Sequence, residues 1–579
     1  MVYETMVIII SCTKSMIITI LILIIFCAVL INGANVKSSS SIGTKGQWQL
    51  LLHNSGVVSM HMALTNRNTV IMFDQTGAGQ SGYKLRKRYN GTRCTTSHND
   101  LVDPTCYAHS VEYDIAANKV RPLRLDPDTW CSSGSFLSNG TLLQTGGYGN
   151  GAKSIRFCRP CGGGGGGKNL TCGWIQSKKT LFDERRYASS QILAEHDRVV
   201  IVGGRNVFTY EFVPKINHEE KSFALPFLHQ TNDKNSGGNN LYPFLHLSSD
   251  GNLFIFANRD SILLNARRNR VIKTFPRIPG HGSRNYPSSG SSVMLPLHHK
   301  DKFQKVEVMV CGGSTTGAFR AANDGMFLEG LRSCGRMVIT GNHHKWNIEY
   351  MPQPRLLHDM LILPTGQILI INGAKHGCAG FDNARNASLE PYLYNPKRIL
   401  GKRFKVLKST SIARMHHSSA TLLPDGRVLV GGGNPHPRYI FRNVAYPTEL
   451  RLQAFVPHYM DKRYHNKRPM NLTIEYGNQI GYGKEFRVKF MVVKKGQISN
   501  NTVTFSAYAP PFTTHAFGMN QRMLKLRCKR MVVSKNGSVN AILEAPPSSF
   551  VAPSGYYLLT VVNAGIPSIS QWIRFTHNG

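Results

Sequence analysis

The chain has 579 residues, 41% of them hydrophobic and 17% charged, with 54 glycines and a formal net charge of +37. This length exceeds the usual size of a domain with a single hydrophobic core, and the composition excludes an intrinsically disordered protein. So many glycines imply many tight turns, which favours a β-rich chain built as several domains or as one large closed repeat.

Residues 1–34 are typical of an export signal. Lys14 precedes an apolar run over residues 16–31, and the small residues Gly33 and Ala34 follow. The run of about 16 residues is shorter than the roughly 20 that a membrane-spanning helix needs. This favours a cleaved signal peptide over a retained membrane anchor, and a secreted, extracellular protein.

Glycosylation sequons and cysteines agree with export. Asn-x-Ser/Thr sequons begin at Asn90, Asn139, Asn169, Asn386, Asn471, Asn500 and Asn536. Proximity in the sequence predicts the disulfides Cys94–Cys106 and Cys311–Cys334. Around Cys158, Cys161 and Cys172 a disulfide loop is favoured over a zinc site, because no histidine follows nearby. Cys378 and Cys528 have no partner close in the sequence.

Basic residues cluster in runs that begin at Lys84, Arg267 and Lys397. Outside the cell their natural counter-charges are acidic polysaccharides or anionic membrane surfaces rather than nucleic acid. A basic surface that serves only solubility explains the same runs equally well.

An internal repeat organises most of the mature chain. A short apolar strand after a turn such as Asp-Gly ends in a Gly-Gly or Asn-Gly type pair, at intervals of about 54–60 residues. The pairs end at Gly147, Gly204, Asn258, Gly313, Gly373 and Gly433. With a degenerate unit ending near Gln75, they predict a kelch-type β-propeller of seven four-stranded blades over residues 35–445.

A different alternating pattern occupies residues 446–579. It begins with TELRLQAFVP and continues through strands such as EFRVKFMVV and GYYLLTVVNAG. We expect a single immunoglobulin-like β-sandwich there. The glycine run after Cys161 lacks the Lys-Ser/Thr and helix of a phosphate-binding loop, so we interpret it as a loop insertion.

Chemically useful side chains occupy one repeat position in three units. Cys131 lies 15 residues before its glycine pair and Tyr187 lies 16 before, while His416 and His417 lie 15 and 14 before Gly431, the first of three consecutive glycines. Since equivalent positions of propeller blades converge on the axis, these side chains are expected to meet. Taken singly, Cys131 and Tyr187 would be interpreted as core packing.

The sequence resembles the plant glyoxal oxidase branch of the copper radical oxidases, which are related to galactose oxidase. The stretches that carry the resemblance include IVGGRNVFTYEFVPK, RNYPSSGSSVMLPL and PPFTTHAFGMNQR. The resemblance implies a thioether between Cys131 and the copper ligand Tyr187, with His417 and His515 as further ligands. It also implies oxidation of a small aldehyde to a carboxylic acid with reduction of dioxygen to hydrogen peroxide in the cell-wall space, by a monomer.

One position departs from the family pattern. The family has a tyrosine before the first of the two ligating histidines, as an axial copper ligand that takes a proton from substrate, whereas this chain has His416. Imidazole binds copper and acts as a base, but it cannot reproduce a phenolate's charge. His358 and His436 are interpreted as structural residues.

Two hypotheses follow. The first is a secreted aldehyde oxidase that uses copper and a Cys131–Tyr187 radical cofactor, with dioxygen and an aldehyde as substrates. The second is a catalytically impaired relative that holds acidic cell-wall polysaccharide through its basic surface.

Overall fold

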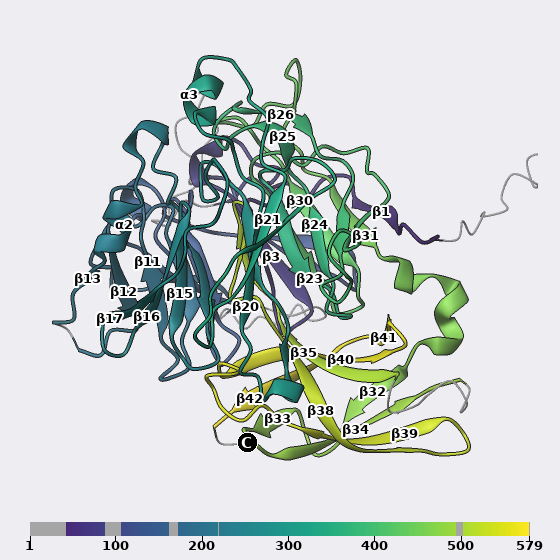
Figure 1. Cartoon of the computed structure of the whole chain (residues 1–579). Helices are drawn as coiled ribbons and strands as arrows, with labels where there is room; N and C mark the ends of the chain where they lie inside the picture. The colour runs from purple at the N-terminus through teal and green to yellow at the C-terminus, as the bar shows by residue number, and fades with distance from the viewer. Residues whose placement is uncertain (1–41, 87–105, 161–171, 218, 494–501, 578–579) are drawn as a thin grey trace, which may run out of the picture. The chain divides into compact units, whose positions relative to one another are not determined.

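Short apolar strands joined by glycine turns build the fold, shown in Figure 1 as a computed structural model. Strands such as β11 (Val199–Val202) and β15 (Leu253–Ala257) are buried along their whole length. The turns before them need a positive φ, and Gly251 supplies one at 83° ahead of β15. The structure describes residues 42–86, 106–160, 172–217, 219–493 and 502–577.

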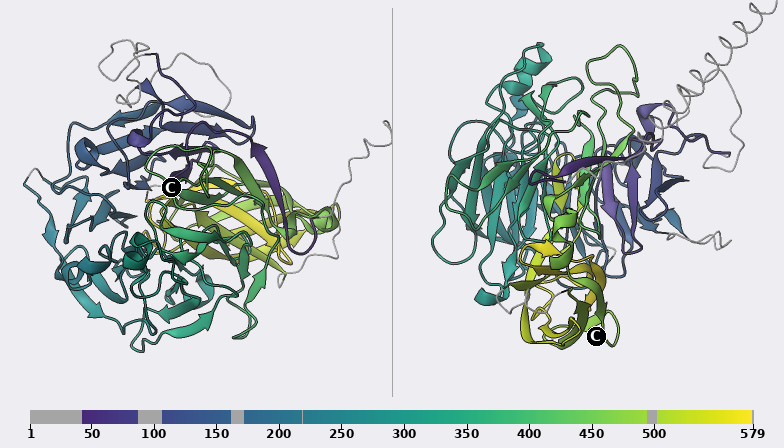
Figure 2. Two further views of the ribbon diagram at one scale, coloured as in Figure 1. Left: turned by 90° about the horizontal axis from the view of Figure 1, so that it is seen from above. Right: turned by 90° about the vertical axis from the view of Figure 1, so that its right-hand side faces the viewer.

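Seven antiparallel sheets form the blades of a β-propeller, arranged around a ring in the left view of Figure 2. Three blades consist of β2 (His61–Leu64), β3 (Thr69–Phe73), β4 (Ser110–Asp114), β5 (Lys119–Leu123); β6 (Ser133–Phe136), β7 (Leu142–Thr145), β8 (Ile155–Arg159), β9 (Gly173–Gln176); and β10 (Ser189–Ile192), β11, β12 (Thr209–Val213), β13 (Phe223–Ala224). The next three consist of β14 (Phe244–Leu247), β15, β16 (Asp260–Asn265), β17 (Arg270–Thr274); β18 (Ser291–Met294), β20 (Glu307–Cys311), β21 (Ser333–Val338), β22 (Asn347–Tyr350); and β23 (Asp359–Ile362), β24 (Ile368–Ile371), β27 (Tyr392–Tyr394), β28 (Phe404–Val406). The predicted seven-bladed architecture is confirmed.

The last blade closes the ring with a strand from the beginning of the described chain. It consists of β29 (Ser418–Leu422), β30 (Val428–Gly432), β31 (Leu452–Val456) and β1 (Gln47–Leu52). β1 pairs with β31, so residues about 400 positions apart share one blade. This pairing ties the last blade to the segment that precedes the first blade, and so closes the ring.

The same blade corrects the boundary predicted at residue 446. The segment TELRLQAFVP was expected to begin the sandwich, but it contains β31, which pairs with β30 as well as β1. The strand lacks a glycine pair because it is the third strand of its blade, and the repeat marks second strands. The propeller therefore extends past Val456.

The remaining strands form the C-terminal β-sandwich, labelled at the bottom of Figure 1. They are β32 (Met470–Ile474), β33 (Gln479–Gly481), β34 (Glu485–Met491), β35 (Val503–Ala509), β38 (Arg522–Val533), β39 (Ser538–Glu544), β40 (Gly555–Asn563), β41 (Ile566–Pro567) and β42 (Gln571–Thr576). The long strand β38 belongs to both layers, because its first half pairs with β35 and its second half with β39. Strand β34 alternates exposed and buried residues, as a one-sided sheet requires.

A hairpin from the sandwich enters the propeller axis. Its strands β36 (Phe512–Thr514) and β37 (Phe517–Met519) are fully buried. β36 pairs with the inner strand β2, and β37 contacts the inner strands β10, β14, β18 and β23. The centre of the ring is therefore filled by this hairpin, which in Figure 1 rises in yellow between the blades.

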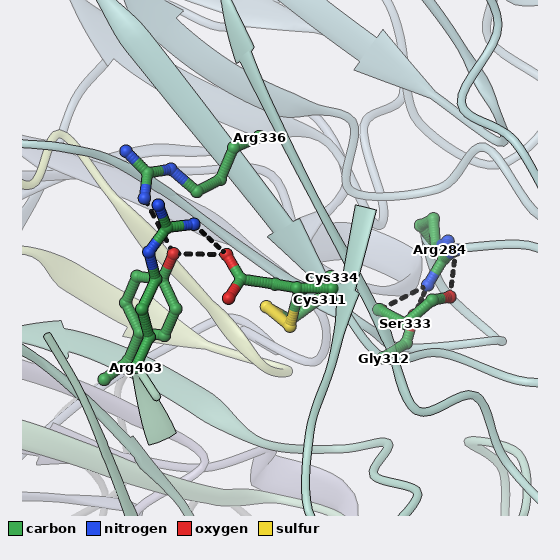
Figure 3. The surroundings of a disulfide bond; sticks show 9 residues. Arg284, Cys311, Gly312, Ser333, Cys334, Arg336 and Arg403 are labelled. Carbon is green, nitrogen blue, oxygen red and sulfur yellow. Dashed lines mark hydrogen bonds and ion pairs between the residues drawn. A yellow bond between two sulfur atoms is a disulfide. The ribbon is translucent and has the colours of Figure 1, made fainter. Parts of the chain in front are cut away.

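Buried arginines, called arginine clamps below, stabilise individual blades by donating hydrogen bonds to backbone carbonyls. Arg185, Arg284, Arg355 and Arg414 are almost completely buried and precede inner strands. Each donates to the carbonyl at the end of the second strand of its own blade: Gly203 at 2.7 Å, Gly312 at 2.7 Å, Asn372 at 2.8 Å and Gly432 at 2.9 Å. Figure 3 shows Arg284 in this role, beside Ser333 and the Cys311–Cys334 disulfide. Part of the positive charge is thus structural.

The predicted Cys311–Cys334 bridge is confirmed, and it joins the neighbouring strands β20 and β21. Cys172 is disulfide-bonded, whereas Cys158 is a buried free thiol and so lies outside the disulfide loop expected there. Cys378 and Cys528 are free. The export signal, Cys94, Cys161 and the sequons at Asn90, Asn169 and Asn500 lie outside the described residues.

The other elements are short. They are β19 (Leu297–His298), β25 (Ala374–Gly377), β26 (Ala384–Ala387), the helices α2 (Pro226–Gln230) and α3 (Ala318–Asn323), and the 3-10 helices η1 (Thr76–Ala78), η3 (Gly149–Gly151), η4 (Lys234–Ser236), η5 (His299–Asp301), η6 (His458–Met460) and η7 (Lys462–Lys467). Within the described part of the chain, no helix is both long enough and apolar enough to cross a membrane.

Candidate metal centre

Three histidines meet at the propeller axis. The ligating nitrogens that His416, His417 and His515 offer lie within 4.8 Å of one another, and all three side chains are buried. The rings of His416 and His417 are stacked with their centroids 3.9 Å apart, and the His515 ring lies 5.0 Å from that of His417. The structure therefore brings the three predicted histidines together.

The hairpin turn explains how His515 reaches this point. Strands β36 and β37 are joined by only two residues, His515 and Ala516, with φ values of 45° and 70°. Two positive φ values are what the tight two-residue hairpin turn demands, and residues other than glycine adopt them at a cost. His515 is thus held at the tip of the inserted hairpin.

The blade residues occupy matched backbone positions. Cys131 and Tyr187 lie two residues before the inner strands β6 and β10, His417 lies one residue before β29, and their φ values are 58°, 64° and 62°. The Tyr187 amide donates to the Cys131 carbonyl at 2.8 Å, which links the two blades at this point. A left-handed backbone conformation is uncommon in residues other than glycine. At these positions it directs the side chains toward the propeller axis.

The thiol and phenol lie beside the histidines. Sγ of Cys131 is 3.5 Å from Nε2 of His515, and the side chains of Cys131 and Tyr187 are within hydrogen-bonding reach of each other. The Tyr187 ring centroid is 6.0 Å from that of His515. All the predicted site residues are therefore gathered in one cluster.

Burial sets the protonation of the cluster. It lowers the pKa of His416 to about 3 and holds the pKa values of His417 and His515 well below their usual range. It raises the pKa of the Cys131 thiol to about 12 and also raises the pKa of the Tyr187 phenol. The imidazoles are consequently neutral, which is the form that binds metals.

The structure adds two phenols that the sequence interpretation missed. The hydroxyls of Tyr286 and Tyr187 are 3.4 Å apart, and the Tyr286 ring lies 5.9 Å from the ring of His416. Tyr242 packs against His515 with ring centroids 5.0 Å apart. Tyr242 precedes its Ala257–Asn258 pair at the spacing seen for Cys131, so extending the repeat comparison to the third unit finds it. Tyr286 follows no such spacing.

The histidines interpreted as structural lie outside the group of three. His436 is held by Asp382 at 3.0 Å and by the Tyr446 carbonyl at 2.9 Å. His358 is fully buried against the backbone at Gly312. His61 stacks on Phe73, and its Nε2 is 3.1 Å from the Ser132 hydroxyl.

The cluster fits a copper ion by its chemistry. Both ring nitrogens of His416 and of His417 are buried without a hydrogen-bond partner in the structure. Unpartnered buried nitrogens are costly unless a ligand satisfies them. Imidazole nitrogens together with phenol oxygens are a donor set that suits Cu(II).

Comparisons with known proteins agree with this geometry. Residues 60–459 match the family model described as glyoxal oxidase N-terminus, and residues 468–575 match the galactose oxidase-like early set domain. Aldehyde oxidase GLOX1 of Arabidopsis thaliana is 41% identical over 547 residues, covering 93% of this chain and 86% of the relative. Aldehyde oxidase GLOX of Vitis pseudoreticulata is 41% identical over 531 residues, covering 91% and 97%.

A solved structure shares the fold. A fungal alcohol oxidase in complex with copper superimposes with a TM-score of 0.67 at 17% identity, over 92% of this chain and 100% of that one. A propeller with this axial cluster and an early set domain places the chain among the galactose oxidase-like proteins. Within that class, it belongs to the glyoxal oxidase family. The polysaccharide-binding alternative is not favoured by these comparisons.

Proposed function

We propose that this protein is a secreted, copper-dependent aldehyde oxidase. It converts an aldehyde, water and dioxygen to a carboxylic acid and hydrogen peroxide. The observation that carries the proposal is the buried group of His416, His417 and His515 beside Tyr187, in a chain 41% identical to proteins named aldehyde oxidases. The partnerless ring nitrogens support a metal at this point.

The residues that would hold copper are Tyr187, His416, His417 and His515. Bound there, copper would supply one-electron redox chemistry, and a Cys131–Tyr187 thioether would store the second electron as a radical. The adjacency of thiol and phenol supports this pairing, because the two side chains are within hydrogen-bonding reach. Neutral imidazoles at His417 and His515 leave their nitrogens ready to coordinate.

His416 takes the place of the family's proton-accepting tyrosine. Neither ring nitrogen has a hydrogen-bond partner in the structure. A neutral imidazole has one nitrogen with a free lone pair, so His416 would take the proton that the substrate loses when that nitrogen is not holding copper. Stacking on His417 fixes the orientation of the ring. Burial excludes bulk water, which limits competing reactions of an oxidised side chain.

Export would place this reaction outside the cell. The sequon asparagines within the described residues, Asn139, Asn386, Asn471 and Asn536, are all exposed. Exposure is required for glycan attachment. A mobility shift of the expressed protein on treatment with a glycosidase that removes N-linked glycans checks this part of the proposal.

The test uses the full chain, purified and loaded with copper. Bound copper is quantified, and peroxide and carboxylic acid are measured with a panel of small aldehydes that includes methylglyoxal. The proposal expects copper bound at one site per chain and equal amounts of acid and peroxide. Full copper loading with neither product from any aldehyde would overturn it.

A further inference from the structure

Two arginines lie over the ring of Tyr187. The guanidinium carbon of Arg186 is 5.0 Å from the centroid of that ring, and the guanidinium carbon of Arg205 is 5.1 Å from it. The Arg205 amide donates to the Arg186 carbonyl at 2.7 Å, so the backbone holds these residues together. Two cations therefore lie within about 5 Å of the ring of the candidate copper ligand.

Neither guanidinium group forms a salt bridge with a described residue. Within the described residues neither Arg186 nor Arg205 has an ion pair, whereas Arg185 is bonded to Glu211 at 2.8 Å. The carboxylate of Asp128 is close enough to interact with the charge of Arg186, while its Oδ1 accepts from the backbone amides of Thr76 and Trp130 at 3.1 and 2.9 Å. With two guanidinium groups and one nearby carboxylate, the pair keeps a net positive charge that an anionic ligand can neutralise.

The surroundings of Arg186 favour the binding of a ligand that accepts hydrogen bonds. Its guanidinium carbon lies 3.8 Å from the ring centroid of Trp130 and 4.5 Å from the ring centroid of Tyr148. Nε of Arg186 and Nε1 of Trp130 are both buried donors without a partner. Donors in this state are costly unless a ligand accepts from them.

The two arginines extend from the protein surface toward the buried Tyr187. Arg205 is exposed, Arg186 is half-buried, and Tyr187 is only 3% exposed. Nη2 of Arg186 is 3.4 Å from the Tyr187 hydroxyl. A carboxylate held by Arg186 would therefore bring a carbonyl carbon bonded to it close to the phenol oxygen.

We propose that Arg186 and Arg205 form a carboxylate-binding subsite that selects aldehydes carrying a carboxylate next to the reacting carbon. This inference rests on the proposed aldehyde oxidation. Guanidinium groups bind carboxylates through paired, charge-assisted hydrogen bonds, which fix orientation as well as charge. The smallest such substrate is glyoxylate: glyoxylate, dioxygen and water give hydrogen oxalate and hydrogen peroxide, with two electrons passing from the aldehyde to dioxygen.

The kinetic test compares glyoxylate with methylglyoxal, a neutral aldehyde of similar size. Arg186→Gln and Arg205→Gln should each raise the KM for glyoxylate about tenfold more than the KM for methylglyoxal. Arg186→Lys keeps the charge and should recover part of the loss. Arg268→Gln, an exposed change of equal charge between β16 and β17, should leave both values unchanged.

Binding is measured separately from turnover. Pyruvate has the carboxylate but no aldehyde hydrogen, and butanedione is its neutral counterpart, so saturation-transfer NMR reports their binding without oxidation. We expect the pyruvate signal to fall several-fold in Arg186→Gln and Arg205→Gln, with butanedione unaffected. Pyruvate binding equal in all variants, or a glyoxylate KM that does not respond, would overturn the subsite. Arginine-dependent pyruvate binding in a protein that oxidises no aldehyde would instead overturn the proposed function.

Discussion

Nε2 of His515 lies 3.5 Å from Sγ of Cys131, although 384 positions of the chain separate the two residues. Cys131 comes from a propeller blade, and His515 comes from the hairpin that the sandwich sends into the ring. The candidate metal centre therefore exists only when the hairpin between β36 and β37 is docked on the propeller.

Replacing His515 tests this dependence. His515→Gln removes an imidazole nitrogen from the group of three, so copper affinity should fall by more than about tenfold. Copper is quantified by mass spectrometry after dialysis against a weak chelator.

His246→Gln serves as the matched control. His246 is equally buried, and among the described residues its ring bonds only to the Ser292 hydroxyl, at 2.7 Å, away from the group of three. It should retain wild-type copper. Equal copper in His515→Gln and wild type would contradict the ligand assignment.

The propeller blades and most of the candidate metal centre could be predicted from the sequence for one physical reason. A closed ring makes equivalent repeat positions converge, so the spacing of Cys131, Tyr187 and His417 before their glycine pairs predicted their meeting. His515 lies outside the repeat, and only the family resemblance indicated it. Tyr286 follows neither signal, because its position depends on packing between blades. Arg186 precedes Tyr187 as His416 precedes His417, but that position alone does not predict that its side chain lies over the Tyr187 ring.

A covalent bond between Cys131 and Tyr187 is the second expectation. Forming the thioether removes one hydrogen from the thiol and one from the ring, with an oxidant taking two electrons. Proteolysis under reducing conditions should therefore yield one linked peptide containing both residues, lighter than the two separate peptides by two hydrogens. Tandem mass spectrometry identifies it.

The substitution Tyr242→Phe provides the comparison for this experiment. Tyr242 lies 5.6 Å from Tyr187 between ring centroids and is also close to the cluster, but it has no assigned role in the cross-link. The linked peptide should persist in Tyr242→Phe and disappear in Cys131→Ser. Two separate peptides in the copper-treated wild type would refute the cross-link.

The arginine clamps are expected to govern stability. Arg355 is fully buried and donates to the carbonyls of Asn372 at 2.8 Å and Glu390 at 2.5 Å. Arg355→Met leaves both carbonyls without this donor, which should cost about 2–5 kcal/mol. Thermal unfolding should show a clearly lower Tm, whereas exposed Arg398→Met should differ little from wild type.

Asp359 makes stability depend on pH. Burial raises the pKa of its carboxyl to about 8, and Asn372 donates to it at 2.8 Å. In the unfolded chain the pKa is about 3.9, so between pH 4 and 8 the folded state holds the extra proton. Stability from this residue is therefore present at pH 4 and is lost as the pH rises toward 8.

Asp359→Asn removes that dependence. The variant should gain on the order of 1–4 kcal/mol over wild type on going from pH 5 to pH 8, measured by denaturant unfolding. Exposed Asp324→Asn should show no such gain. A difference between Asp359→Asn and wild type that stays constant across this range would contradict the assignment.

His416 decides whether imidazole replaces the family's tyrosine in proton transfer. Because neither of its nitrogens has a partner in the structure, His416→Phe should keep the fold while removing the proton acceptor and one of the four candidate copper donors. Peroxide release from a small aldehyde should then fall by about 10²–10⁴-fold while copper remains bound through His417, His515 and Tyr187. His416→Tyr restores an acceptor and should recover release, together with the radical absorption of the oxidised site. Wild-type turnover in His416→Phe would show that another group, such as the Tyr286 hydroxyl 3.4 Å from Tyr187, accepts the proton.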